Sequence, residues 1–153
     1  PIAASSCDTS EPPALLAGAS RILRSHERAA GGRRSLGWDG VRALPYKLET
    51  TLFRGVTRHV LAAPERATFD VRYYEVEPGG HTTHEVHEHV HVIVVLRGLG
   101  RVRLGGETHE LGFADVVYIS PRDPHQFLNP YGEPFGFLCI VDRARDRPVT
   151  VEE

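Results

Sequence analysis

The sequence predicts an all-β sandwich or barrel, preceded by one short helix. Beyond Gly40 the chain is built of short apolar or alternating runs rich in Val, Ile, Phe and Tyr, and such runs are typical of strands that bury one face. Turn sequences separate them, namely "EPGG", "RGLG", "LGGE" and "SPRDP", which supply Gly where φ must be positive or Pro where φ must be fixed. The predicted strands span 52–61, 67–77, 90–97, 99–104, 107–111, 115–119, 124–129 and 134–141.

The N-terminal part has a different pattern. Residues 1–13 are small, polar and proline-bearing, and we expect a frayed tail because they bury too little to offset the entropy of ordering. Over Ala14–Ala30 apolar residues recur at three- and four-residue steps before Gly31–Gly32, which predicts one short amphipathic helix with a glycine stop. The predicted organisation is a flexible leader and helix over 1–40, a barrel over 41–145 and a solvated C-terminal tail over 146–153.

The composition indicates an ordinary globular domain. The 153 residues are 41% apolar and 25% charged, which suits one core. The formal net charge of -2 gives no reason to expect nucleic acid or anionic lipid as a partner. No apolar run approaches the ~20 residues of a membrane span, so we expect a cytoplasmic protein. Cys7 and Cys139 are too few for a disulfide framework and are expected to be free thiols.

The segment "HTTHEVHEHVH", residues 81–91, is the strongest functional signal, with five histidines and two glutamates. On an extended strand Glu85, His87, His89 and His91 would share one face, about 7 Å apart, so three ligands could meet only if the chain curls. His125, after the "SPRDP" turn, could supply a partner from across a barrel. The alternative is a polar strand face. So many imidazoles together favour a metal site for Mn, Fe, Co, Ni or Zn.

The segment "PGGHTTHEVHEHVHVIVVLRGLG" and the later "LGFADVVYISPRDPHQFLN" resemble the two motifs of the cupin superfamily, and together they cover residues 78–129. The resemblance implies a double-stranded β-helix, a jelly-roll barrel with the metal inside its wider end. It implies that the metal ligands are Glu85, His87, His91 and His125. Glu85 stands where the general pattern has His, and His91 where it has Glu. The resemblance also makes Asn129 a structural hydrogen-bonding residue, and places His81, His84 and His89 between ligand positions as turn, surface or supporting residues.

Flanks such as "VRYYEVEPGG" and "FGFLCIVDRARDRP" are similar to a subgroup of small bacterial cupins that includes methylthioxylulose-phosphate methylsulfurylases. The resemblance implies a metal-dependent enzyme acting on a small oxygenated substrate, with Mn or Fe favoured, that releases methanethiol. Cys139 is the candidate catalytic thiol, and the alternative is a buried apolar side chain. Lys47 and Arg58 are candidate phosphate contacts or surface salt bridges.

Two other functions remain open from the sequence. One is a cupin dioxygenase that uses Fe or Cu, and the other is a non-catalytic cupin that binds metal or sugar. The expected partners are a small-molecule substrate and a second copy in a homodimer, without nucleic acid or membrane.

Overall fold

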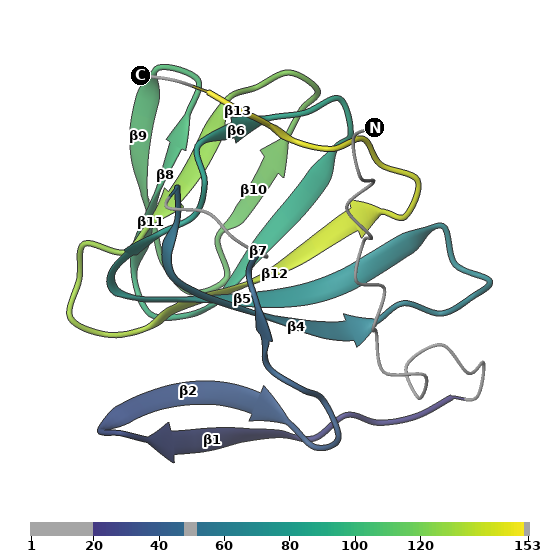
Figure 1. The fold of residues 1–153 in the computed structure, drawn as a ribbon, viewed down its shortest axis with the longest axis vertical. Helices are drawn as coiled ribbons and strands as arrows, with labels where there is room; N and C mark the ends of the chain where they lie inside the picture. Colours follow the sequence, from purple (N-terminus) through teal and green to yellow (C-terminus); the bar gives the residue numbers. More distant parts are fainter. Residues whose placement is uncertain (1–19, 48–51, 152–153) are drawn as a thin grey trace, which may run out of the picture.

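The computed structural model describes residues 20–47 and 52–151, and within these ranges all regular secondary structure is β (Figure 1). The all-β prediction is confirmed. The strands are β1 (Ser25–Ala30), β2 (Arg33–Trp38), β3 (Leu44–Pro45), β4 (Arg54–Ala62), β5 (Phe69–His81), β6 (Glu85–Val86), β7 (His91–Arg97), β8 (Gly100–Leu104), β9 (Glu107–Leu111), β10 (Val116–Ile119), β11 (His125–Leu128), β12 (Phe135–Asp142) and β13 (Val149–Thr150).

Strands β3 to β13 form one sheet that curls into a jelly-roll barrel (Figure 1). One layer follows the order β4–β5–β12–β7–β10, and the other follows β9–β8–β11–β6–β13. Strand β5 joins the two layers because its last residue, His81, pairs with Leu128 of β11. The prediction that the strand ends at a turn in "EPGG" is wrong, since β5 continues through these residues to His81. Gly79 has a φ of 75° there, and the pairing of β5 with β4 changes register between Val76 and His81.

The eight predicted strands match β4, β5 and β7 to β12, with ends that differ by a few residues. The three two-residue strands β3, β6 and β13 were not predicted, because so short a segment carries no periodic signal. Strand β13 lies in the predicted C-terminal tail, and it pairs with β6.

The barrel interior changes character along the strands. Alternate residues of β7 and β12 point inward, as the period of two requires, and they supply the buried Ile93, Val95, Phe135 and Phe137. Towards one end, apolar side chains give way to buried histidines at the starts of β7 and β11. The polar groups of this end are therefore held by strands whose other inward residues form the core.

The predicted N-terminal helix is wrong over the part that the structure describes. Residues 20–24 have no regular structure, and Ser25–Ala30 form β1, which pairs with β2 in a separate hairpin; residues 14–19 of the predicted helix, the predicted frayed leader 1–13 and Cys7 lie outside the described residues. Gly31–Gly32, predicted as a helix stop, is the hairpin turn, with φ values of 59° and 77°. Two glycines at positive φ suit a two-residue turn between twisted strands.

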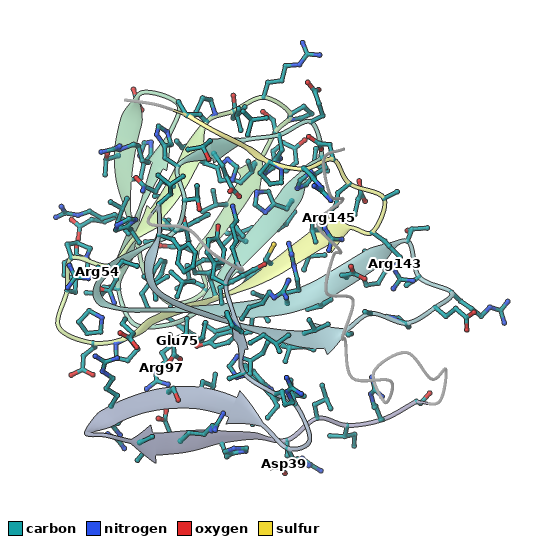
Figure 2. All side chains as sticks on the ribbon, viewed as in Figure 1. Asp39, Arg54, Glu75, Arg97, Arg143 and Arg145 are labelled. Carbon is teal, nitrogen blue, oxygen red and sulfur yellow. The ribbon has the colours of Figure 1, made fainter. Side chains whose placement is uncertain are left out.

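The hairpin is attached to the outer face of the barrel (Figure 2). Trp38 packs edge-on against Tyr73, with ring centroids 4.9 Å apart. The buried carboxylate of Glu75 accepts hydrogen bonds from the Leu36 amide at 3.0 Å and from the Tyr73 hydroxyl at 2.8 Å, and Arg97 lies 3.4 Å from it. Since this face points away from the interior, the hairpin leaves the polar end of the barrel open.

Asn129, which the resemblance makes a structural hydrogen-bonding residue, is buried and joins the two layers. Its side-chain amide donates to the carbonyls of Val76 at 2.9 Å and Glu133 at 2.7 Å, and its oxygen accepts from the Tyr131 amide at 3.0 Å. Across residues 20–47 and 52–151, no helix long and apolar enough to cross a membrane is found.

Candidate metal centre

Three imidazoles converge inside the polar end of the barrel. A ligand nitrogen from each of His87, His91 and His125 lies within 4.8 Å of the other two, and all three residues are buried. His91 begins β7 and His125 begins β11, while His87 lies in the short connection between β6 and β7. That connection provides the curl that a straight strand lacks.

The Nδ1 atom of each of these rings has a protein partner. The Nδ1–H of His87 donates to the carbonyl of His89 at 2.8 Å, and that of His125 donates to the carbonyl of Asp123 at 2.9 Å. His91 Nδ1 lies 3.3 Å from Cys139 Sγ. A carbonyl only accepts, so Nδ1 of His87 and His125 must carry the proton and Nε2 has a free lone pair. Such partners fix the orientation of imidazole ligands in metal sites.

The electrostatics keep these imidazoles neutral. Burial, together with the neighbouring His125 and His87, lowers the pKa of His91 to about 2. Burial also lowers the pKa values of His87 and His125. His91 Nε2 is buried without a hydrogen-bond partner, which is costly unless a ligand uses it. Three neutral imidazoles with free lone pairs therefore fit a divalent transition-metal ion.

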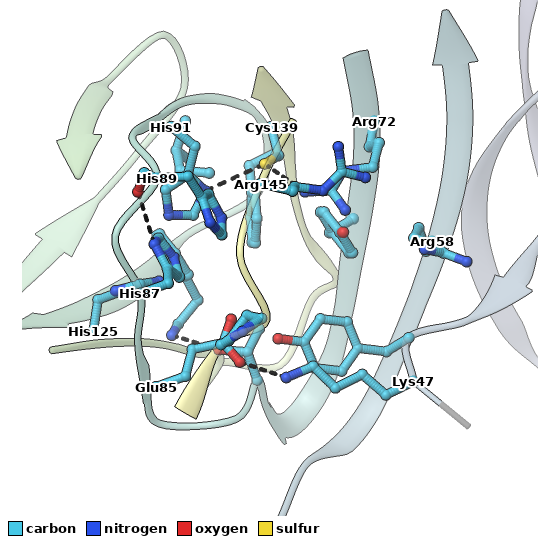
Figure 3. Close-up of a pocket in the computed structure, with 17 residues that line it drawn as sticks. Lys47, Arg58, Arg72, Glu85, His87, His89, His91, His125, Cys139 and Arg145 are labelled. Carbon is cyan, nitrogen blue, oxygen red and sulfur yellow. Dashed lines mark hydrogen bonds and ion pairs between the residues drawn. The ribbon is translucent and has the colours of Figure 1, made fainter. Parts of the chain in front are cut away.

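Glu85, the fourth predicted ligand, lies in the same cavity but outside this three-histidine cluster. It is buried in β6, where it pairs with His125 across the strands, and its carboxylate forms an ion pair with Lys47 (Figure 3). The structure thus brings three of the four predicted ligands together and holds the fourth beside them through Lys47.

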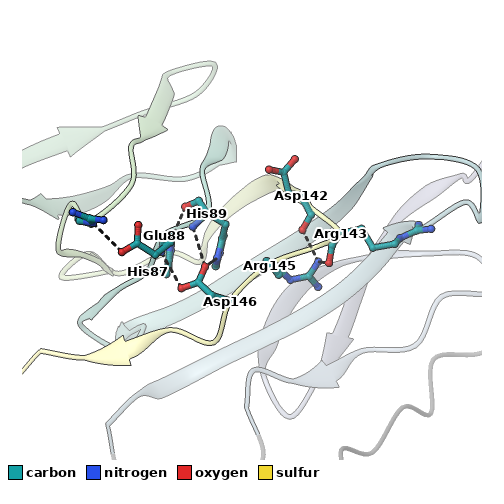
Figure 4. A network of polar contacts seen from close by, with 8 residues as sticks. His87, Glu88, His89, Asp142, Arg143, Arg145 and Asp146 are labelled. Atoms are coloured by element: carbon teal, nitrogen blue, oxygen red, sulfur yellow. Dashed lines mark hydrogen bonds and ion pairs between the residues drawn. The ribbon is translucent and has the colours of Figure 1, made fainter.

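The connection that carries His87 is fixed by Asp146 (Figure 4). The Asp146 carboxylate accepts hydrogen bonds from the backbone amides of Glu88 and His89, both at 2.9 Å, and from His89 Nδ1 at 2.7 Å. The His89 ring stacks on His87 with centroids 3.7 Å apart. His89 is therefore a supporting residue, and its partner Asp146 lies in the predicted tail.

The remaining two histidines of residues 81–91, His81 and His84, lie outside the three-histidine cluster. His84 has both ring nitrogens buried without a hydrogen-bond partner. His81 Nδ1 lies 3.1 Å from the carbonyl of its neighbour Thr82.

Cys139 faces the cavity from β12 as a buried free thiol. Its sulfur lies between His91 Nδ1 at 3.3 Å and Arg72 Nη2 at 3.4 Å (Figure 3). Burial raises the pKa of the Cys139 thiol, and the Arg72 guanidinium opposes that rise. The thiol is thus in contact with the histidine cluster on one side and with a cation on the other.

The cavity has a volume of about 190 Å³, below the common range for drug-sized ligands and suited to a small metabolite. Lys47 and Arg58 line it, together with Arg72 and Arg145. Sequence reasoning missed the last two, although the inward parity of Arg72, two residues before Tyr74 in β5, was a usable signal. Lys47 forms its salt bridge inside the cavity and not on the surface.

Comparison with known proteins agrees with this geometry. Residues 72–141 match the model of the cupin domain family. The chain is also 43% identical over 112 residues to the 1-methylthio-D-xylulose 5-phosphate methylsulfurylase of Rhodospirillum rubrum, covering 72% of this chain and 72% of that protein. The chain belongs to the cupin family. The cupin fold predicted from the two motifs is confirmed.

Several solved structures resemble most of this chain. A cupin-2 domain from Rhodospirillum rubrum has a TM-score of 0.74 at 40% identity, covering 79% of this chain and 82% of that chain. A cupin 2 conserved barrel protein from Rhodopseudomonas palustris has a TM-score of 0.73 at 37% identity, with 84% and 86% covered. A polyketide cyclase from Streptomyces resistomycificus has a TM-score of 0.67 at 28% identity, with 74% and 82% covered.

Proposed function

We propose that this cupin is a metal-dependent methylsulfurylase that releases methanethiol from a methylthio-pentulose phosphate. The observation that carries the proposal is the position of Cys139, whose sulfur lies 3.3 Å from His91 inside the cavity. The similarity to a methylsulfurylase over 72% of the chain supports the same reaction.

We propose His87, His91 and His125 as ligands of one Mn or Fe ion, with Glu85 as the fourth ligand that the first cupin motif implies. The bound ion would supply a Lewis acid that polarises the substrate carbonyl. The residues themselves arrange the site: the fixed Nδ1 atoms orient the imidazoles, and Lys47 holds the Glu85 carboxylate through an ion pair.

The reaction proposed for Cys139 is a transfer of the methylthio group. The thiolate attacks the substrate sulfur, and the bond between that sulfur and C1 breaks with its electron pair moving to C1, next to the carbonyl. C1 then takes up a proton that replaces the one lost by the thiol. Cys139 now carries a mixed methyl disulfide. Two molecules of an external thiol reduce it, are themselves oxidised to a disulfide, and release methanethiol and the Cys139 thiol.

The test follows methanethiol released from 1-methylthio-xylulose 5-phosphate by metal-loaded protein with a thiol reductant, with and without O₂. We expect release that needs the thiol and not O₂. Cys139→Ser should abolish it while metal content stays unchanged, and Cys7→Ser is the matched thiol control. Without reductant, mass spectrometry should find one methylthio group on Cys139. Oxygen uptake without methanethiol would instead indicate a dioxygenase, and no turnover by metal-replete protein would refute the proposal.

A separate measurement tests the ligands. Glu85→Ala and His125→Ala should each lower the metal affinity by about 10- to 100-fold or more. His109→Ala, at an exposed position of β9, should leave it unchanged. Equal affinity in the Glu85 variant and the His109 variant would remove Glu85 from the ligand set.

A further inference from the structure

We propose that Arg58 and Arg72 form a subsite for the phosphate group of a phosphomonoester, on the side of the cavity away from the histidines (Figure 3). The two arginines lie on adjacent strands, where Arg58 pairs with Tyr74 and Arg72 pairs with Val60. Both line the cavity. Adjacent strands of the first layer thus each contribute one arginine to the lining of the cavity.

Neither arginine has a carboxylate partner within the part of the chain that the structure describes. The Nε atoms of Arg58 and Arg72 are buried and make no hydrogen bond. Arg72 directs one Nη2 hydrogen bond to Cys139 Sγ. A buried guanidinium N–H without an acceptor has lost its hydration without compensation. Two such groups in one cavity indicate that the compensating anion comes from a ligand.

The remaining cations of the cavity are already compensated. Lys47 pairs with Glu85, and Arg145 donates to the Asp70 carboxylate at 2.9 Å and to the Asp142 carbonyl at 2.8 Å. Asp70 is shared with Arg143, at 3.0 Å. Among the residues that the structure describes, the cavity therefore keeps two guanidinium groups without a carboxylate partner, those of Arg58 and Arg72.

Two positive charges match a phosphomonoester better than a carboxylate. A phosphomonoester carries about -1.5 to -2 at neutral pH and has three acceptor oxygens. A carboxylate carries one charge and would compensate only one guanidinium. The planar fork of Arg also binds phosphate oxygens through paired N–H groups.

The subsite gives the substrate a direction, and this step rests on the proposed function. A chain of contacts leads from His91 to Cys139 at 3.3 Å and from Cys139 to Arg72 at 3.4 Å. A sugar phosphate with its phosphate on the arginines extends towards the thiol and the histidines. The reacting end then lies at Cys139 and the charged end at Arg58 and Arg72.

The experiment measures binding by calorimetry to metal-loaded protein, with inorganic phosphate, xylulose 5-phosphate, unphosphorylated xylulose and acetate as probes. We expect xylulose 5-phosphate to bind at least 10-fold more tightly than xylulose, and phosphate more tightly than acetate. Arg58→Gln should weaken both phosphate-containing probes at least 10-fold and leave xylulose unchanged, because Arg58 contacts neither Cys139 nor the histidine cluster in the structure. Arg58→Lys, which keeps the charge but loses the fork, should give an intermediate loss. Arg101→Gln, which removes an exposed guanidinium from β8, should bind all probes as the wild type does.

Equal binding of phosphorylated and unphosphorylated xylulose, or wild-type phosphate affinity in both Arg58 variants, would overturn the subsite. Acetate bound as tightly as phosphate would overturn the phosphate assignment. Metal content of each variant checks that the fold is intact. The subsite and the proposed reaction fail separately: phosphate-dependent binding without methanethiol release refutes only the reaction, and methanethiol release with an unchanged KM in Arg58→Gln refutes only the subsite.

Discussion

Lowering the pH should destabilise the metal-free protein, because the three-histidine cluster resists protonation. The pKa of His91 is about 2 in the folded chain, against an ordinary value of 6.5. Below pH 6.5 the unfolded chain binds a proton at this residue and the folded chain does not, so stability falls as the pH falls. His91 alone should cost about 1.4 kcal/mol at pH 5.5 and about 2.7 kcal/mol at pH 4.5 relative to neutral pH. His87 and His125 shift in the same direction and add to the loss.

Urea unfolding in the presence of a chelator, at several pH values between 7.5 and 4.5, measures this slope. His91→Gln should have a shallower slope, whatever its stability at neutral pH, since it removes one of the three groups. His109→Gln, exposed on β9, should keep the wild-type slope. A free energy of unfolding that does not change between pH 7.5 and 5.5 would refute the reasoning, and so would equal slopes in wild type and His91→Gln.

Three further changes test other parts of the structure. Asn129→Ala should lower the free energy of unfolding by about 3 kcal/mol in urea, because it removes three hydrogen bonds from a buried position. Asp146→Ala should lower the metal affinity by about 10- to 100-fold in calorimetry, since the connection that carries His87 loses its three hydrogen bonds to this carboxylate. Gly136→Ala should cost about 3 kcal/mol or more in thermal unfolding, because a Cβ there would lie 1.9 Å from the Tyr73 hydroxyl oxygen.

Matched variants separate these effects from general damage. Asn129→Asp keeps an acceptor oxygen and loses the amide donor. At acid pH, where the new carboxyl group is neutral, its free energy of unfolding should fall by less than that of Asn129→Ala. Asp115→Ala removes a carboxylate that accepts one backbone amide in an exposed turn, and it should not change metal affinity. Gly132→Ala has open space at its Cβ and should be neutral. An Asp146 variant with wild-type metal affinity would show that His87 is oriented without it.

The barrel was predictable because turn sequences separate short runs rich in Val, Ile, Phe and Tyr, and because strands such as β7 and β10 alternate in burial from one residue to the next. The N-terminal hairpin was not, because all six residues of β1 are exposed and carry no strand periodicity. The apolar residues at helical spacing upstream of Gly31–Gly32 instead favour a helix. The turn rule for a Gly pair between two strands would have identified the hairpin, had the flanks been read as strands.

The histidines of the site were predictable from motif spacing, but their environment was not. The ion pair of Lys47 with Glu85 and the contacts of Asp146 with the His89 segment join residues 38 and 57 positions apart. Such pairs depend on which strands become neighbours, which no local pattern encodes. Arg72 and Arg145 were missed for the same reason, since their roles depend on the cavity that the curled sheet creates.

The link between Asp146 and the segment after His87 also has a consequence for the order of folding. The carboxylate that fixes this segment follows His89 by 57 positions, so it can dock only after β12 has joined the sheet and the chain has reversed beyond it. Contacts of such long sequence separation form slowly. We therefore expect affinity for the proposed metal ion to develop late, after most strands have paired. Such an ion should slow unfolding and leave the folding rate nearly unchanged.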